Sequence, residues 1–393
     1  MLTDGRVIAS ERPPNIRHYA ALAATVRHGS LSRAARAVHL SQPALSQAIV
    51  GLETSLGVGL FERGPRGMTP TEPSLLLAPR AEAAISLIGS SRVTGTQVRA
   101  FLAVARAGSY SAAAEATGLS SASMHRAVAD LGVALGQRLI ERRGRSLLLT
   151  AAGERRARGF RLAMAELRAG RAEVAAWQGK AGGRIAVGAM SLSRARWLPE
   201  TITRFVVKHP GVDIAVHEGS HAELAGPLRD GEIDLMLGAL RESVEVDDLV
   251  QEPLFEDRPV LVMRAGHPLL GAENLAEAML DYPWVLSGRE TPLRRFWESM
   301  VRALGREPPH IPIECGSVMM VRQLLLAGDR LTLLSRDQVS VELDAGVLAA
   351  MPPPVAVSRT IGLTTRNGWR PTTAQADFVA LLRETARNLG TNS

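Results

Sequence analysis

A segment near the start of the chain is followed almost at once by a second copy of itself. Shifting the sequence by 79 positions aligns residues 19–74 with residues 98–153 without a gap, and 20 of the 56 aligned positions are identical. Gly29-Ser30 recurs as Gly108-Ser109, and Leu56-Gly57 recurs as Leu135-Gly136. Shared glycines are not expected of unrelated alanine-rich helices. The repeat therefore predicts two copies of one supersecondary unit.

Each copy has the pattern of three helices followed by a hairpin. In the first copy Ser30 can cap a helix that runs to Ala37, and Ser41 can cap the next, with Pro43 tolerated in its first turn. Two short helices joined by a tight turn are a helix-turn-helix. The inward stripe of the second helix is predicted to be Leu45, Ile49, Leu52 and Leu56. Residues 61–71 are basic and rich in turn formers, which is typical of a hairpin wing.

Charge divides the chain into two unlike halves. Residues 1–180 hold 24 basic and 12 acidic side chains, net +12, whereas residues 181–393 hold 22 and 27, net −5. All the basic residues except Lys180 and Lys208 are arginines, which can grip phosphates and base edges bidentately. A polyanion-binding region joined to a different domain is the simplest interpretation.

The second half alternates between strand and helix patterns. Strands are predicted at 184–190, 212–216 and 233–237, and helices at 198–208 and 223–229. Strands that alternate with helices predict an α/β fold with a parallel sheet. The single cysteine excludes a disulfide framework, no apolar run is long enough to span a membrane, and the N-terminus lacks a signal-peptide pattern. We therefore expect a cytoplasmic protein without membrane contact.

The first copy contains Ala34-Ala35, the string Leu40-Ser41-Gln42-Pro43-Ala44-Leu45-Ser46-Gln47, Leu52-Glu53, Leu56-Gly57 and Leu60-Phe61-Glu62-Arg63. With these residues it resembles the DNA-binding head of LysR-type transcriptional regulators. The second copy is less similar at 120–126 and more similar at its exit, 149–154. The phrases at 231–235 and 267–269 resemble the family's effector-binding domain, which has two lobes like periplasmic solute-binding proteins.

The resemblance implies that the second helix of the first copy reads base edges in the major groove. The expected base-reading residues are Gln42, Pro43, Ala44, Ser46 and Gln47. The expected contacts to the DNA backbone are Ser30, Arg33, Arg63 and Arg66 from the first copy, and Arg126, Arg142 and Arg145 from the second. We expect the second copy to touch DNA mainly through phosphates. A second base reader, a dimerisation spacer and a relic are the alternatives.

A long helix is predicted from about Glu154 to Gln178, roughly 37 Å at 1.5 Å per residue. One stripe along it contains Phe160, Met164, Leu167, Val174 and Trp177. In the family a long helix dimerises the protein, so the stripe is interpreted as a seam between two chains. Packing on its own domain is the alternative. After the first copy, Pro73 would obstruct such a helix by about 3 kcal/mol in its interior but not in its first turn.

The string His217-Glu218-Gly219-Ser220-His221 fits the metalloprotease pattern H-E-x-x-H. That motif needs both histidines on one helical face. Here His217 continues a strand, and Ser220 with Glu223 can form a capping box that starts the helix later. We therefore expect no zinc site, no other metal or cofactor, and no catalytic residues.

The effector site is expected between the lobes, at the carboxyl ends of parallel strands. The candidate residues there are Ser191, Ser193, Ser220 and His221 from one lobe, and Ser287, Thr291 and Ser317 from the other. Hydroxyls and free backbone N–H groups suit a small carboxylate or a polyol. Where the family usually has Gly-x-Gly, this chain has Gly328-Asp329-Arg330, so the shape of the pocket and the class of effector are less transferable.

The resemblance implies a sequence-specific, allosteric regulator of the LysR type. The expected parts are a first winged helix-turn-helix at 15–88, a second at 94–152, a dimerisation helix at 153–180 and an effector domain at 182–389. Within the effector domain, lobe one would be 182–258 with 359–389, and lobe two would be 259–358. The expected partners are double-stranded DNA, a small-molecule effector, RNA polymerase, and further copies of the chain in a dimer or tetramer. A cytoplasmic small-molecule sensor with vestigial heads is the alternative.

Overall fold

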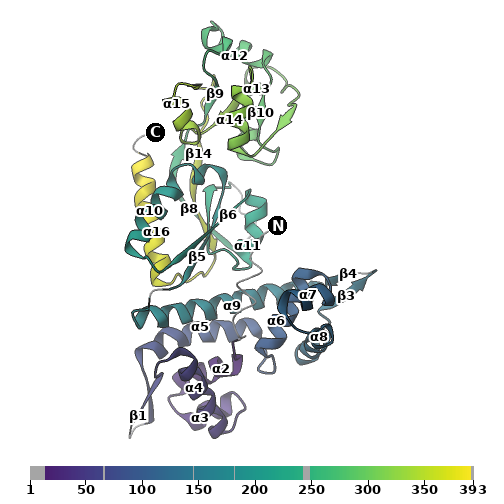
Figure 1. Cartoon of the computed structure of the whole chain (residues 1–393), viewed down its shortest axis with the longest axis vertical. Helices are drawn as coiled ribbons and strands as arrows, with labels where there is room; N and C mark the ends of the chain where they lie inside the picture. The colour runs from purple at the N-terminus through teal and green to yellow at the C-terminus, as the bar shows by residue number, and fades with distance from the viewer. Residues whose placement is uncertain (1–13, 65–66, 145, 181, 242–247, 391–393) are drawn as a thin grey trace. The chain divides into compact units, whose positions relative to one another are not determined.

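The computed structural model describes residues 14–64, 67–144, 146–180, 182–241 and 248–390 (Figure 1). The chain divides into two compact units. Unit one comprises residues 1–183 with 230–232, and unit two comprises 184–229 with 233–393. None of the helices in the described ranges is long and apolar enough to cross a membrane.

Unit one contains two heads with the same order of elements. The first head consists of α2 (Ile16–His28), α3 (Leu31–Ala37), α4 (Gln42–Leu56), β1 (Phe61–Gly64) and β2 (Gly67–Pro70). The second consists of α6 (Gly95–Ala107), α7 (Tyr110–Thr117), α8 (Ser121–Leu135), β3 (Ile140–Arg143) and β4 (Ser146–Leu149). The predicted helices and hairpins are present in both.

Serine hydroxyls set the start of the second helix-turn-helix helix in each head. Ser41 accepts a hydrogen bond from the backbone N–H of Ala44 at 3.3 Å, and Ser120 accepts one from Ser123 at 3.1 Å. Each bond satisfies one of the N–H groups that a helix start leaves unpaired. Of the predicted inward stripe of α4, Leu45, Ile49 and Leu52 are buried, and Leu56 is half-buried.

Each head continues into a longer helix. α5 (Glu72–Ile88) follows the first head, and α9 (Ala151–Trp177) follows the second. Pro73 lies in the first turn of α5, where it lacks only an N–H that would be unpaired in any case. The sequence left open whether such a helix follows the first head, because Pro73 would obstruct it in its interior but not in its first turn. The two helices lie side by side, with one head at each end of the pair (Figure 1).

The prediction of a seam between two chains is wrong for three residues of the α9 stripe. Phe160, Leu167 and Val174 are each no more than 2% exposed within a single chain, where they share one core with residues of α5 and both heads. Met164 is half-buried and Trp177 is 46% exposed. α5 covers the stripe that a partner chain was expected to cover.

Unit two contains a five-stranded sheet with the order β6-β5-β7-β14-β8. Its strands are β5 (Arg184–Ala189), β6 (Asp213–Glu218), β7 (Leu235–Ala239), β8 (Leu249–Asp257) and β14 (Arg359–Arg366). β5 is parallel to β6 and β7, but β14 is antiparallel to both β7 and β8. The predicted parallel sheet is therefore correct for three strands only, because the returning chain enters the sheet in the opposite direction.

Helices cover both faces of this sheet. α10 (Trp197–Lys208) and α16 (Thr373–Gly390) pack together and share one apolar core with the sheet. α11 (His221–Arg229) packs through a second cluster that includes Met236 of β7. We call this sheet and its helices lobe one.

Residues 259–358 form a smaller α/β assembly, which we call lobe two. Its three-stranded sheet has β9 (Val260–Arg264) between β12 (Thr332–Leu334) and β13 (Leu348–Met351), and β10 (Val285–Leu286) pairs with β11 (Ile313–Glu314). The helices are α12 (Leu275–Ala278), α13 (Pro292–Ala303), α14 (Val318–Leu326) and α15 (Ser340–Asp344). The buried rings of Trp284 and Trp297 meet edge to face in its core.

Candidate DNA interface and effector site

The N-terminal turn of α4 presents the residues predicted to read bases. Gln42, Pro43 and Gln47 are exposed, and Ala44 and Ser46 are half-buried. The hydroxyl of Ser32 donates to Gln42 Oε1 at 3.1 Å, which leaves the amide N–H groups of Gln42 as donors for a base edge. α4 thus has the polar and apolar groups that major-groove recognition uses.

The residues expected at phosphates are only partly described. Arg33 is exposed on α3, and Ser30 is the N-cap residue of that helix, although its hydroxyl makes no capping hydrogen bond. Arg63 lies on β1, and Arg66 lies outside the described residues.

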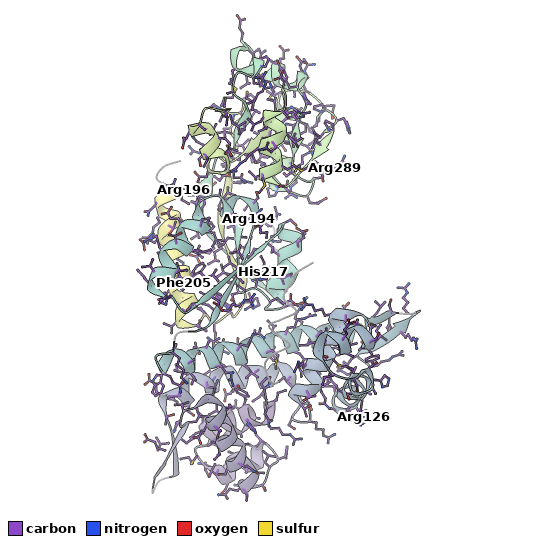
Figure 2. The ribbon with its side chains drawn as sticks, in the orientation of Figure 1. Arg126, Arg194, Arg196, Phe205, His217 and Arg289 are labelled. Carbon is purple, nitrogen blue, oxygen red and sulfur yellow. The ribbon has the colours of Figure 1, made fainter. Side chains whose placement is uncertain are left out.

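The second head presents a different set of side chains from the equivalent helix. On α8, Ser121, Ser123, His125 and Arg126 are all exposed, and Figure 2 labels Arg126 on this head. The ring of His125 packs 5.1 Å from that of Tyr110. In the wing, Arg142 is exposed and its Nε donates to Gly144 O at 3.3 Å, whereas Arg145 lies outside the described residues.

The H-E-x-x-H string does not form a metal site in the described structure. His217 lies in β6 and His221 is the first residue of α11. Between them, the backbone N–H and hydroxyl of Ser220 donate to Glu223, and the Glu223 N–H donates back to Ser220 Oγ. The predicted capping box is therefore present, and it separates the histidines onto two elements.

Most of the serines predicted to bind an effector already have structural partners. Ser193 is fully buried, and its hydroxyl donates to Met190 O at 2.8 Å, so it is not available to a ligand. Its prediction as an effector residue is wrong, because it lies inside a short helical turn and its hydroxyl bonds back to the backbone at the start of that turn. Thr291 and Ser317 cap α13 and α14, and the Ser287 and Thr291 hydroxyls lie 2.7 Å apart.

Polar side chains meet where lobes one and two come together. The Gln338 side-chain amide from lobe two donates to Ser191 Oγ at 2.9 Å. Elsewhere at the junction, Asp257 at the end of β8 accepts from Ser335 Oγ at 2.6 Å and from Arg359 Nε at 2.7 Å. These polar contacts join the lobes.

Arg241 is the feature of this junction that sequence reasoning missed. It follows β7, and the Gln251 side chain holds its backbone by accepting from the Arg241 N–H and donating to its carbonyl, both at 2.9 Å. Among the described residues, nothing hydrogen-bonds to its buried Nη1. Burial, and then the positive charges of Arg295 and Arg359, lower the pKa of Arg241. The signal in the sequence is an arginine directly after an apolar strand, at the carboxyl end expected to face a ligand.

The positive charge of Arg241 also acts on His221. Burial, followed by the charges of Arg241 and Arg229, lowers the pKa of His221, which favours its neutral form. Arg359 already has Asp257 as its carboxylate, whereas neither Arg241 nor Arg295 forms an ion pair with any carboxylate of the described ranges. The junction therefore carries positive charge that the described protein does not neutralise, an arrangement suited to a small anion.

Comparison with known proteins agrees with both halves of the molecule. Residues 16–74 and again 96–154 match the family described as bacterial regulatory helix-turn-helix protein, lysR family. Residues 178–387 match the LysR substrate binding domain.

One relative matches nearly the whole chain, and two solved structures match about three quarters of it. The HTH-type transcriptional regulator GalR of Pseudomonas putida is 31% identical over 385 residues, which is 94% of this chain and 97% of that protein. A full-length OxyR variant from Pseudomonas aeruginosa has a TM-score of 0.55 at 22% identity, covering 74% of this chain and 94% of its own. CbnR, a LysR family transcriptional regulator, has a TM-score of 0.53 at 21% identity, covering 74% and 98%. The chain belongs to the LysR family of transcriptional regulators, with a DNA-binding helix-turn-helix region and an effector-binding domain.

Proposed function

We propose that this regulator reads a specific operator through α4 and responds to a small anionic effector bound beside Arg241. Base reading would fall to Gln42, Pro43, Ala44, Ser46 and Gln47, with Ser30, Arg33, Arg63 and Arg66 on the DNA backbone. The exposed N-terminal turn of α4 supports this assignment.

The chemistry of the effector follows from Arg241. A carboxylate can accept two parallel hydrogen bonds from one guanidinium, and Arg241 has a buried Nη1 without a partner in the described structure. The positive charge of Arg295 would add to the attraction. A small carboxylate is therefore favoured over a polyol, which would leave the charges uncompensated. Ser191, Ser220, His221, Ser287, Thr291 and Ser317 would supply polar contacts around it.

The allosteric mechanism requires that the effector bind one arrangement of the protein better than another. An anion that joins Arg241 of lobe one to Arg295 of lobe two would favour the arrangement in which these like charges are close. We propose that this changes the assembly of a dimer or tetramer on DNA and its contact with RNA polymerase in the cytoplasm, without a catalytic step.

DNA reading is tested by selecting bound sequences from a random pool with the full-length protein near physiological salt. We expect an enriched motif that Gln47→Ala weakens or changes, because Gln can pair bidentately with adenine. Arg171→Ala, an exposed change on α9, is the control. Binding without sequence enrichment, in the presence and absence of candidate effectors, would instead support a sensor with vestigial heads.

Effector chemistry is tested separately by screening small carboxylates and uncharged polyols for thermal stabilisation of the protein. A carboxylate that stabilises the wild type should lose its effect with Arg241→Gln and keep it with Arg258→Gln, an exposed arginine of the same unit. Stabilisation by polyols alone would reject the anionic assignment.

A further inference from the structure

The helices that leave the two heads form an antiparallel pair inside one chain. Gly170 of α9 lies against Leu77 near the start of α5, and Arg156 near the start of α9 donates to Ile88 O at the end of α5, at 3.5 Å. Residue numbers therefore rise along one helix as they fall along the other. The heads lie at opposite ends of this pair (Figure 1).

The contacts of the pair follow the 79-residue repeat. Arg80 of α5 aligns with Gly159 of α9, and Leu87 aligns with Glu166. In the structure Arg80 Nη1 lies 3.2 Å from Glu166 Oε2, and Gly159 lies against the carbonyl of Leu87. Each contact is thus the counterpart of the other when the helices are exchanged. The pair has the approximate two-fold relation of a dimer, built from one chain.

The centre of the pair follows the same relation. Ala84 aligns with Ala163 and Ile88 with Leu167, and all four are no more than 2% exposed. Small side chains at equivalent positions allow the two backbones to approach. We call this contact between α5 and α9 the seam. At these positions the apolar side chains are already buried within a single chain and are not available to a second copy.

The seam also selects unlike helices over like ones. Arg80 is 5% exposed and contacts two α9 carboxylates, with Nη2 lying 2.9 Å from Glu173 Oε1. By the repeat, two α5 helices in this register would set Arg80 against Leu87, and two α9 helices would set Glu166 against Gly159. Either like pair would bury a charge without its partner, which disfavours the wrong pairing.

The reading helices at the two ends differ in the chemistry they present. Gln47 of α4 aligns with Arg126 of α8, and both are exposed. Gln pairs bidentately with adenine, whereas Arg pairs bidentately with guanine. Gln42 likewise aligns with Ser121. Two identical half-sites would not suit both helices.

We propose that a single chain holds both members of the DNA-reading pair and recognises two unlike half-sites. α4 would read a half-site that contains A·T pairs, and α8 would read one that contains guanine through Arg126. This proposal assigns base reading to the second head in addition to phosphate contact. It rests on the proposed base reading by α4. α9 is 27 residues long, about 40 Å at 1.5 Å per residue, comparable with one turn of DNA, roughly 34 Å.

Sequence selection with the full-length protein and two variants tests the half-sites. The selected motif should contain two different halves. Gln47→Ala should remove the preference in one, and Arg126→Ala the preference in the other, each with about 10-fold weaker binding. Arg171→Ala should change neither half. A palindrome of the α4 half-site that Arg126→Ala leaves intact would overturn the proposal while base reading by α4 stands. A pool without enrichment would instead reject base reading itself.

Complementation tests whether the pair lies within one chain. Differently tagged Gln47→Ala and Arg126→Ala chains are co-expressed, and doubly tagged complexes are isolated and assayed on a single selected site. If each pair is formed within a chain, no pair has two intact heads and binding stays about 10-fold weaker. If α5 of one chain pairs with α9 of another, intact pairs form and tight binding returns for part of the sample. That return would overturn the single-chain pair.

Discussion

Each unit has an arginine with a buried guanidinium nitrogen, and the two arginines differ in what surrounds them. Arg80 in the α5–α9 seam is 5% exposed and has two carboxylates within 3.2 Å. Arg241 at the lobe junction has a buried Nη1 with no hydrogen-bond partner among the described residues and faces other positive charges. Arg80, with its own carboxylates, specifies which helices pair, whereas Arg241, whose Nη1 has no partner in the described part of the chain, is suited to a ligand.

The largest effect is expected from breaking the Arg80 cluster. Arg80→Met leaves Glu166 and Glu173 without their cation and should lower the stability of the seam by about 3–5 kcal/mol. Hydrogen exchange of α5 and α9 peptides measures the change. Arg27→Met removes a more exposed ion pair, between α2 and Glu82 of α5, and should cost less than about 1 kcal/mol. Equal effects from the two variants would contradict this account of the seam.

The closeness of the seam can be probed at Gly170. A Cβ there would lie 2.6 Å from Leu77 Cδ1 and 3.1 Å from Arg80 Cβ, so Gly170→Ala should destabilise unit one by about 1–3 kcal/mol. At Gly226 in α11 a Cβ meets nothing within 4 Å, and Gly226→Ala should be neutral or stabilising by up to about 1 kcal/mol. Urea denaturation compares them. A stabilising Gly170→Ala would show that the helices are not closely packed.

Replacing Arg241 should raise the stability of the ligand-free protein, whereas replacing Arg80 should lower it. Arg241→Gln removes a guanidinium whose buried Nη1 has no hydrogen-bond partner among the described residues, so unit two should become more stable by about 1 kcal/mol in the absence of effector. Denaturation without and with a stabilising carboxylate measures both effects, because the variant should also lose the response to the ligand. A loss of stability in the ligand-free protein would mean that Arg241 is structural, like Arg80.

The smallest effect concerns His221. Its pKa is lowered in the folded protein, so the unfolded chain binds a proton at a higher pH than the folded chain. Its contribution should therefore decrease stability as the pH falls through its ordinary pKa, about 6.5. Denaturation between about pH 7.5 and 5.5 should show a shallower loss for His221→Gln than for the wild type. His310→Gln, at an exposed site, should leave the slope unchanged.

Local signals in the sequence predicted local structure well. Ser41 and Ser120 cap their helices, and the Ser220–Glu223 capping box separates the two histidines of the H-E-x-x-H string. These features depend on residues within a few positions of each other, so their spacing is sufficient to predict them. The antiparallel entry of β14 is not local, because its partners lie about a hundred residues or more away along the chain.

The candidate site was also predicted only in part, because some of its features depend on residues that are far apart in the sequence. The reading turn of α4 is continuous in sequence and is exposed as expected at Gln42 and Gln47. Ser193 is a poor effector candidate, because its hydroxyl turns back to its own backbone. Arg241 was missed because the surroundings of its Nη1, which has no hydrogen-bond partner among the described residues, depend on the tertiary structure.

The sequence by itself determined that the chain has two similar heads, a basic first half and an α/β second half. The tertiary structure decided what the apolar stripe of α9 contacts. An apolar stripe indicates only that one face of a helix will be buried, since the burial of apolar area does not depend on which chain covers it. The distances from Arg80 to Glu166 and Glu173 identify α5 of the same chain as the cover. Charge pairing is directional, and it distinguishes partners that apolar packing does not.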